Sequence, residues 1–247
     1  MKVSSQFATS LDSPQHIAIS ENLGYDRAWL HDTPQQSPDV WMMLALAAER
    51  TDRIGLGPGV LVPALRHPMV NAAATAALYA LAPGRVAVAF GTGFSAARAM
   101  GAKASTWSYA RDYIRVFRDL LRGETVEWNR GHMRMMHPAG FAPPRPIAVP
   151  IAISAVGPKG LAVAKELGDG LFTVNGERGP AELVGEGRAR RSWHCSHGRR
   201  GTGLAADPCR SRPGQRLGLP CRLRIRRRRH RAAGRSGVAG HRQPNTF

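Results

Sequence analysis

The first 180 residues contain no cysteine, which excludes disulfide bonds, thiolate nucleophiles and thiolate metal ligands from that part of the chain. The three cysteines are Cys195, Cys209 and Cys221. No two of them have the spacing of two to four residues that is typical of a zinc site. We therefore expect no metal centre.

Long hydrophobic runs are also missing. Charged residues or prolines interrupt every apolar stretch well before the roughly 20 residues that a membrane-spanning helix needs. The segment 1–11 has one lysine followed by polar residues and lacks the apolar stretch of a secretory signal. The sequence thus predicts no membrane association and a cytoplasmic location.

Lysine is absent from residues 181–247, although they hold 17 of the 35 basic residues, all arginine, and only three acidic residues. Residues 1–180 are nearly balanced, with 18 basic and 14 acidic residues. An unpatterned mixture of arginine, glycine, proline and alanine is what a GC-rich gene yields when it is translated out of frame. We therefore predict one domain over residues 1–176 and a disordered arginine-rich tail over 177–247, with a frameshift as the hypothesis for its origin.

The basic tail raises nucleic-acid binding as an alternative function. The run Arg222–Arg231 can attract phosphate backbones through counterion release. The tail has only Trp193 and Phe247 as aromatic residues for base stacking and shows no recognition motif. Any nucleic-acid binding is therefore expected to be nonspecific.

Residues 1–176 repeat one unit, a short apolar strand followed by a loop and a helix, which is typical of parallel βα architecture. Serine or histidine followed by proline marks helix starts at Ser13, Ser37 and His67. The residues 113–121 predict a strongly amphipathic helix, and 125–136 predict a hairpin. The predicted strands are 2–9, 25–30, 53–62, 85–90, 150–155 and 169–174. The helix after His67 is predicted to bury Val70, Ala74, Ala77, Leu78 and Leu81.

Such units close into a barrel or form a doubly wound sheet. A doubly wound nucleotide fold usually has a glycine-rich loop after its first strand, and Thr9–Pro14 contains no glycine. Glycines follow the later strands instead, at the ends that form the active-site face of a barrel. We therefore predict an α/β fold of the (β/α)8 TIM-barrel family, truncated after about six strands. Its first and sixth strands are expected to be unpaired edges.

Four segments of the chain carry a resemblance to a known family. They are Gly24–Asp32, Gly55–Pro68 (GLGPGVLVPALRHP), Arg85–Gly93 (RVAVAFGTG) and Ile153–Lys159 (ISAVGPK), the last followed by Asp169 and Gly170. In this order and spacing they resemble the bacterial luciferase-like family of flavin- and deazaflavin-dependent oxidoreductases, in particular its methylenetetrahydromethanopterin reductase-like branch. The resemblance covers residues 1 to about 176.

The resemblance implies a site for coenzyme F420, a deazaflavin, or for FMN. It places a non-prolyl cis peptide between Gly59 and Val60, beneath the ring. Gly91, Thr92 and Gly93 would leave room for the ribityl chain or the substrate, although a simple turn explains them equally well. The segment Ser154, Ala155, Gly157, Pro158 and Lys159 is interpreted as a phosphate site at a helix N-terminus, with an ordinary strand-to-helix turn as the alternative.

His31 and Asp32 are weak catalytic candidates at the end of the second strand, where one of the two should point inward. The resemblance implies that Asp32 helps to position the cofactor, and a solvated loop carboxylate is the alternative. The sugar-phosphate dehydrogenase branch has a catalytic glutamate where this chain has Phe94, so the activity of that branch is not expected.

The implied activity is hydride transfer between the bound deazaflavin or flavin and a small organic substrate, because the cofactor carries the chemistry. An FMN-dependent monooxygenase is the alternative. A homodimer is left open, and a truncated barrel with little or no activity is a further interpretation.

Overall fold

The computed structural model describes residues 3–174 and 191–195. The chain divides into two units, Met1–Arg200 and Gly201–Phe247, and the described residues all belong to the first. The predicted domain boundary at residue 176, and the predicted disorder of the tail outside 191–195, lie outside the described residues.

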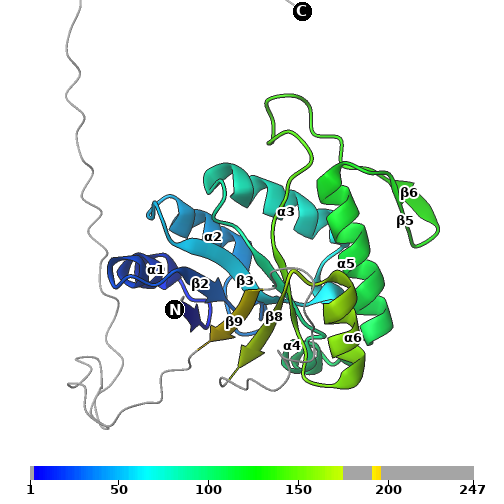
Figure 1. The fold of residues 1–247 in the computed structure, drawn as a ribbon, viewed down its shortest axis with the longest axis horizontal. Helices are drawn as coiled ribbons and strands as arrows, with labels where there is room; N and C mark the ends of the chain where they lie inside the picture. Colours follow the sequence, from blue (N-terminus) through cyan, green and yellow to red (C-terminus); the bar gives the residue numbers. More distant parts are fainter. Residues whose placement is uncertain (1–2, 175–190, 196–247) are drawn as a thin grey trace, which may run out of the picture. The chain divides into compact units, whose positions relative to one another are not determined.

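The six predicted strands form one parallel sheet (Figure 1). A seventh strand, β9 (Arg191–Cys195), joins them in a closed barrel of order β1-β2-β3-β4-β7-β8-β9. This confirms the barrel class. The six strands are β1 (Ser4–Phe7), β2 (Arg27–Leu30), β3 (Gly55–Leu61), β4 (Val88–Phe90), β7 (Ile151–Ser154) and β8 (Gly170–Val174).

β9 corrects the expectation that no strand follows residue 174 and that β1 and β8 are unpaired edges. It pairs with β8 along its whole length and with β1 at one position, Ser4 opposite Cys195. The segment has no apolar pattern, so side-chain periodicity did not indicate it. The edges of a sheet present unpaired backbone groups that accept another strand whatever its side chains are, and β9 satisfies them in this way.

Helices pack along the outside of the barrel in chain order, with α1 against α2, α2 against α3, α3 against α5 and α5 against α6 (Figure 1). The start of α3 at His67 is confirmed, and the His67 side chain accepts a hydrogen bond from the Met69 N–H. α1 and α2 instead have Asp12 and Asp39 as N-caps, and Asp39 accepts hydrogen bonds from two N–H groups of its helix. The elements are α1 (Ser13–Asn22), α2 (Val40–Ala48), the 3-10 turn η1 (Pro63–Leu65), α3 (Pro68–Leu81), α4 (Phe94–Ala99), α5 (Trp107–Arg122), the hairpin β5 (Val126–Trp128) and β6 (Gly131–Met133), and α6 (Pro158–Leu167). No helix in the described part is both long and apolar enough to cross a membrane.

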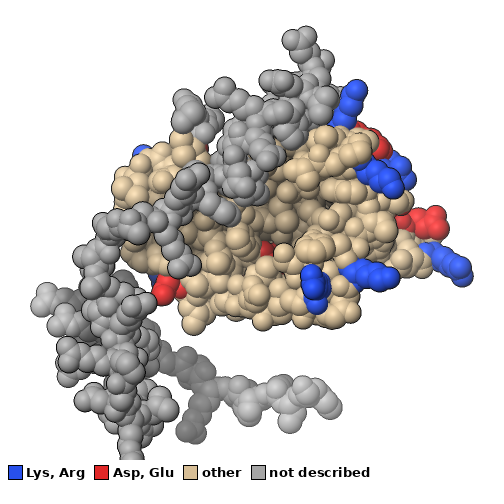
Figure 2. Space-filling model, turned by 90° about the horizontal axis from the view of Figure 1, so that it is seen from below, with Lys and Arg blue, Asp and Glu red and all other residues tan. Residues whose placement is uncertain are grey.

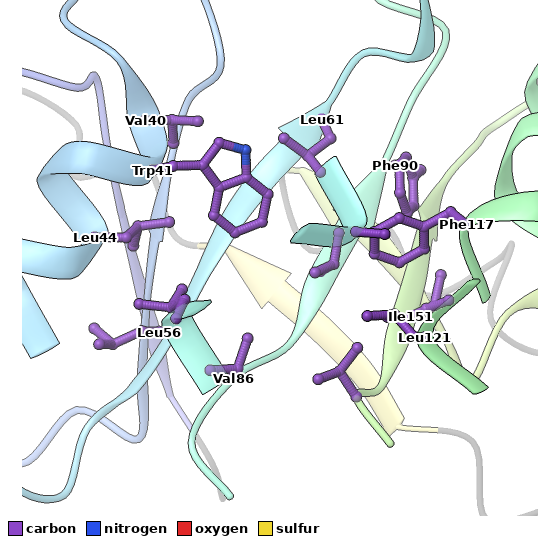
Figure 3. Close-up of a cluster of buried hydrophobic side chains, with 14 of the residues drawn as sticks. Val40, Trp41, Leu44, Leu56, Leu61, Val86, Phe90, Phe117, Leu121 and Ile151 are labelled. Atoms are coloured by element: carbon purple, nitrogen blue, oxygen red, sulfur yellow. The ribbon is translucent and has the colours of Figure 1, made fainter. Parts of the chain in front are cut away.

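The main hydrophobic core lies between the barrel and the helices. Outward residues of the strands, such as Leu56, Phe90 and Ile151, pack against Leu44 of α2 and Phe117 of α5 (Figure 3). These side chains are almost completely removed from water. Their burial is the main force that holds the helices to the sheet.

The inside of the barrel has a second, smaller core. Trp29 and Phe172 meet there edge to face, with ring centroids 5.2 Å apart. The strands beside them contribute small residues, among them Gly57 and Ala87. A Cβ atom at Gly57 would lie 2.0 Å from the Ala87 carbonyl oxygen, so only glycine fits beside Trp29. Two aromatic rings thus fill a space that the small residues leave open.

Charged side chains of both signs lie next to one another on the surface (Figure 2). Arg115 pairs with Glu166, and Arg118 lies 3.0 Å from Asp169. These pairs join α5 to the α6–β8 segment. The described surface shown in Figure 2 is therefore mixed in charge rather than a patch of one sign.

Glu21 of α1 holds the segment that leads into β3. Its Oε2 atom accepts hydrogen bonds from the N–H groups of Arg53 and Ile54 at 2.7 and 2.6 Å, and its Oε1 from Asp52 at 3.2 Å. Burial raises the pKa of Glu21, but these three donors outweigh it, so its pKa is lowered. The anion therefore stabilises the fold above the unfolded-state pKa, and this stability is lost as the pH falls through the folded-state pKa.

We expect Glu21→Gln to lower the free energy of unfolding by about 1 kcal/mol at pH 7, because charge-assisted bonds are stronger than neutral ones and solvent screens this partly exposed group. Urea unfolding at pH 7 and in acid measures the effect. The deficit should shrink in acid, where the glutamate is protonated as well. Glu49→Gln, at the exposed end of α2, is the matched control. A deficit that is the same at both pH values would contradict the role of the charge.

Candidate functional site

A cavity of about 350 Å³ lies at the carboxyl ends of the barrel strands. Strands β1, β2, β3, β4, β7 and β8 all contribute to it, because parallel strands end at the same face of a barrel. Its lining residues are Gln6, His31, Asp32, Thr33, Gly59, Val60, Val62, Gly91, Thr92, Gly93, Phe94, Ser95, Ala96, Ser154 and Phe172. Eight of them were predicted from the sequence: His31, Asp32, Gly59, Val60, Gly91, Thr92, Gly93 and Ser154.

Three glycines keep one wall of this cavity open. A Cβ atom at Gly91 would lie 2.9 Å from Val60 Cγ2, and one at Gly93 would lie 2.1 Å from Val62 Cγ1. Gly93 also has a positive φ of 75°, a conformation that favours glycine. A Cβ atom at Gly59 would press on Trp29 at 3.0 Å. The predicted cis peptide between Gly59 and Val60 is present.

Gln6 of β1 lies at the same wall. Its side-chain N–H donates to the Gly59 carbonyl oxygen at 3.0 Å. Its Oε1 atom is buried and has no hydrogen-bond partner among residues 3–174 and 191–195. A buried acceptor without a partner costs free energy, so this atom is suited to an N–H donor of a ligand.

Asp32 is held by Arg66, which the sequence analysis did not single out. Arg66 Nη1 donates to both Asp32 carboxylate oxygens, at 2.6 and 2.8 Å, and Nη2 donates to Asp39 at 2.8 Å. The Asp32 side chain is 1% exposed and that of Arg66 is 15% exposed. One guanidinium thus bridges a carboxylate at the cavity and the cap of α2.

The two carboxylates respond differently to this arrangement. Burial raises the pKa of Asp32 above its usual value, and Arg66 and the Val62 N–H offset only part of that effect. Burial also raises the pKa of Asp39, but Arg66 and the N–H groups of its own helix outweigh it and leave that pKa lowered. Of the two carboxylates that Arg66 binds, Asp32 is therefore the more easily protonated.

The predicted phosphate segment divides into two parts. Ser154 lines the cavity, whereas Gly157, Pro158 and Lys159 are exposed at the first turn of α6. The first N–H groups of a helix have no partner within it; since Pro158 has no N–H, those that this turn offers to an anion belong to Lys159 and Gly160. Ala155 does not line the cavity; it is buried under the helix, where a Cβ atom at Gly160 would lie 2.6 Å from its own.

His31 lies at the cavity beside Asp32, and its carbonyl oxygen accepts a hydrogen bond from the Thr9 hydroxyl at 2.6 Å. No group of histidine, cysteine, aspartate or glutamate side chains suited to a metal ion occurs in the part of the chain that the structure describes. Sequence reasoning missed seven of the lining residues, which are Gln6, Thr33, Val62, Phe94, Ser95, Ala96 and Phe172. The alternation of inward and outward residues along the strands was the signal that could have indicated Gln6, Val62 and Phe172.

The fold and the cavity define a parallel α/β barrel with a cavity at the carboxyl ends of its strands. The family model of the luciferase-like monooxygenases matches residues 12–201, and the chain belongs to this family. A 5,10-methylenetetrahydromethanopterin reductase of Archaeoglobus fulgidus is 30% identical over 194 residues, which cover 72% of this chain and 56% of the relative.

An F420-dependent glucose-6-phosphate dehydrogenase of Intrasporangium calvum is 31% identical over 178 residues, 66% of this chain and 53% of the relative. The solved structure of the monooxygenase RslO1 from Streptomyces bottropensis superposes with a TM-score of 0.61 at 23% identity, covering 74% of this chain and 63% of that one. The chain thus spans about half the length of the curated relatives it matches.

Proposed function

We propose that this chain is an oxidoreductase that binds coenzyme F420 or FMN in the cavity and acts on a small organic substrate. The observation that carries the proposal is the joining of two features on one barrel face. One is a wall kept open by Gly59, Gly91 and Gly93, and the other is the exposed first turn of α6. A planar ring and a phosphate on a flexible chain require these two features.

The residues of the cavity fit the pyrimidine side of such a ring. The small residues let the ring approach the backbone, and Gln6 Oε1 would accept an N–H group from it. Phe172 and Val60 supply apolar contact and displace water. When bound, either cofactor supplies hydride chemistry, and the protein supplies orientation and electrostatics.

At the other end of the cofactor, the first turn of α6 would hold the phosphate. Its free N–H groups and the positive end of the helix dipole favour an anion, and Lys159 adds a charge. Ser154, at the cavity, would donate its hydroxyl to the ribityl phosphate chain. Asp32, held by Arg66, would orient the ring or substrate and hold a proton at its carboxylate.

We favour the deazaflavin over FMN because, of the curated relatives reported above, one at 30% identity is named a reductase and one at 31% identity is named an F420-dependent dehydrogenase. Phe94 lies at the cavity and is 68% exposed. An apolar side chain there favours a substrate other than a sugar phosphate. FMN-dependent oxygen chemistry is the second candidate.

Binding of FMN, riboflavin and F420 to the full chain tests this proposal. We expect Lys159→Ala to weaken the binding of FMN about tenfold and that of riboflavin hardly at all, because only FMN carries the phosphate. Fluorescence titration at fixed ionic strength measures both, so that general attraction of the basic chain for anions is held constant.

Lys165→Ala, in the last turn of α6, is the matched control, since it removes the same charge from the same helix. Equal losses for FMN and riboflavin would show that α6 does not bind the phosphate. Absence of binding for all three ligands would overturn the proposed function. A much tighter complex with FMN than with F420 would favour the monooxygenase candidate.

A further inference from the structure

A row of buried hydrogen bonds leads from the helices to Asp32. The Trp41 indole N–H donates to Asn71 Oδ1 at 3.0 Å, and the Asn71 amide donates to the Tyr113 hydroxyl at 2.8 Å. The Tyr113 hydroxyl in turn donates to the Arg66 carbonyl oxygen at 2.9 Å. Arg66 then binds Asp32 at the cavity. We call Trp41, Asn71 and Tyr113 the buried relay.

The buried relay joins three helices at a place where apolar side chains would be expected. Asn71 and Tyr113 are fully buried, and Trp41 is nearly so. A buried polar group costs free energy unless it is hydrogen-bonded, and each member here is satisfied by the next. The Trp41 indole can only donate and the Arg66 carbonyl oxygen can only accept. Every hydrogen bond in the row is therefore donated in the direction from Trp41 towards Arg66.

We propose that Trp41, Asn71 and Tyr113 are positioning residues that anchor the Arg66 backbone and thereby hold its guanidinium between Asp32 and Asp39. None of the three lines the cavity. Their influence on the site passes through Arg66, which lies in the short connection between η1 and α3. The importance of Asp32 for a cofactor rests on the proposed function, but the positioning of Arg66 does not.

The anchored position matters because Arg66 is the cation that faces Asp32. The other titratable groups around the pair are Asp39 at the start of α2 and Tyr109 and Tyr113 of α5. His31 and His67 adjoin Asp32 and Arg66 in the chain. Burial and Asp39 raise the pKa of Asp32, and Arg66 lowers it. If Arg66 moves away, the lowering contribution is lost and the pKa of Asp32 rises further.

The test is a carbon-detected NMR titration of the Asp32 carboxyl group in the full chain and in Tyr113→Phe. This variant removes one hydroxyl and keeps the ring. We expect the Asp32 midpoint to move to higher pH. Arg66→Met, which removes the cation itself, should move it in the same direction and by more. Tyr109→Phe is the matched control and should leave it unchanged.

Trp41→Phe removes the first donor of the relay and serves if Tyr113→Phe does not fold. Its expected result is a smaller upward move of the Asp32 midpoint. An Asp32 midpoint that stays at the wild-type value in the folded relay variant, while Arg66→Met moves it, would overturn the proposal. A midpoint that moves in none of the variants would overturn it as well.

FMN titrations at several pH values give a second measurement. We expect the pH at which affinity changes to follow the NMR midpoint from variant to variant. If the NMR midpoints move as expected and neither FMN nor F420 binds to the wild type or to any variant, the proposed function fails and the positioning role stands. If FMN binds and neither midpoint moves, the positioning role fails alone.

Discussion

Replacing Gly91 by valine is expected to abolish the binding of FMN and F420 while the barrel stays folded. The new Cβ atom would lie 2.9 Å from Val60 Cγ2 and 3.7 Å from Ser154 Cβ, so the branched side chain would occupy the space between two cavity residues. The Val60 side chain can shift by a few tenths of an ångström, and overpacking of this kind typically costs about 1–3 kcal/mol. The barrel should therefore survive, but the gap for a planar ring should not.

We expect a loss of at least about 100-fold in affinity, which corresponds to about 3 kcal/mol. Isothermal calorimetry at fixed salt measures it, and urea unfolding shows that the variant is folded. Gly131→Val is the matched control: it lies in the β5–β6 hairpin, where an added Cβ atom would meet nothing closer than the Trp128 carbonyl oxygen at 3.6 Å. Wild-type affinity in Gly91→Val would show that the ring does not lie against this wall.

Much of the architecture was predictable because local signals determine it. Proline after a capping residue begins α3, and short apolar segments bounded by glycine become the strands of the barrel. Since parallel strands end at one face, the glycines after β3 and β4 and Ser154 after β7 could be assigned to one cavity without knowing any contact.

Two features could not be predicted from local patterns. On α3, the pattern predicted that Val70 and Leu81 are buried, but they are 53% and 42% exposed. The buried face carries Asn71 and Thr75 instead. A hydrophobic period assumes that buried positions are apolar, whereas Asn71 is buried because Trp41 and Tyr113 satisfy its amide.

The partner of Asp32 was missed for a related reason. Arg66 lies 34 residues away along the chain, and only the fold brings the two together. The interpretation of Asp32 as a residue that helps to position the cofactor therefore lacked the cation that binds it, and the alternative of a solvated loop carboxylate is wrong, because the Asp32 side chain is 1% exposed. Charged residues that meet between the segments after two neighbouring strands, here β2 and β3, leave no periodic signal in the sequence.

Replacing Trp29 by alanine is expected to remove a large part of the stability of the fold. Trp29 is fully buried inside the barrel, where most of its neighbours from β3, β4 and β7 are glycines and alanines. These residues have no side-chain atoms that could move into the vacated space, so a cavity should remain. Substitutions of this kind cost about 3–5 kcal/mol, against a total of about 5–15 kcal/mol for a typical domain.

Urea unfolding followed by circular dichroism measures the loss for Trp29→Ala. Trp29→Phe should lose less, because a smaller ring still meets Phe172, with which Trp29 now packs edge to face at 5.2 Å. Leu23→Ala is the control: Leu23 is 71% exposed, and its replacement should change stability by less than about 0.5 kcal/mol. A loss below about 1 kcal/mol for Trp29→Ala would mean that the strands close around the gap, contrary to the rigid interior that the small residues of β3 and β4 imply. Because Trp29 lies beside Gly59, where an added Cβ atom would come within 3.0 Å of it, the same variant should weaken cofactor binding even under conditions in which it remains folded.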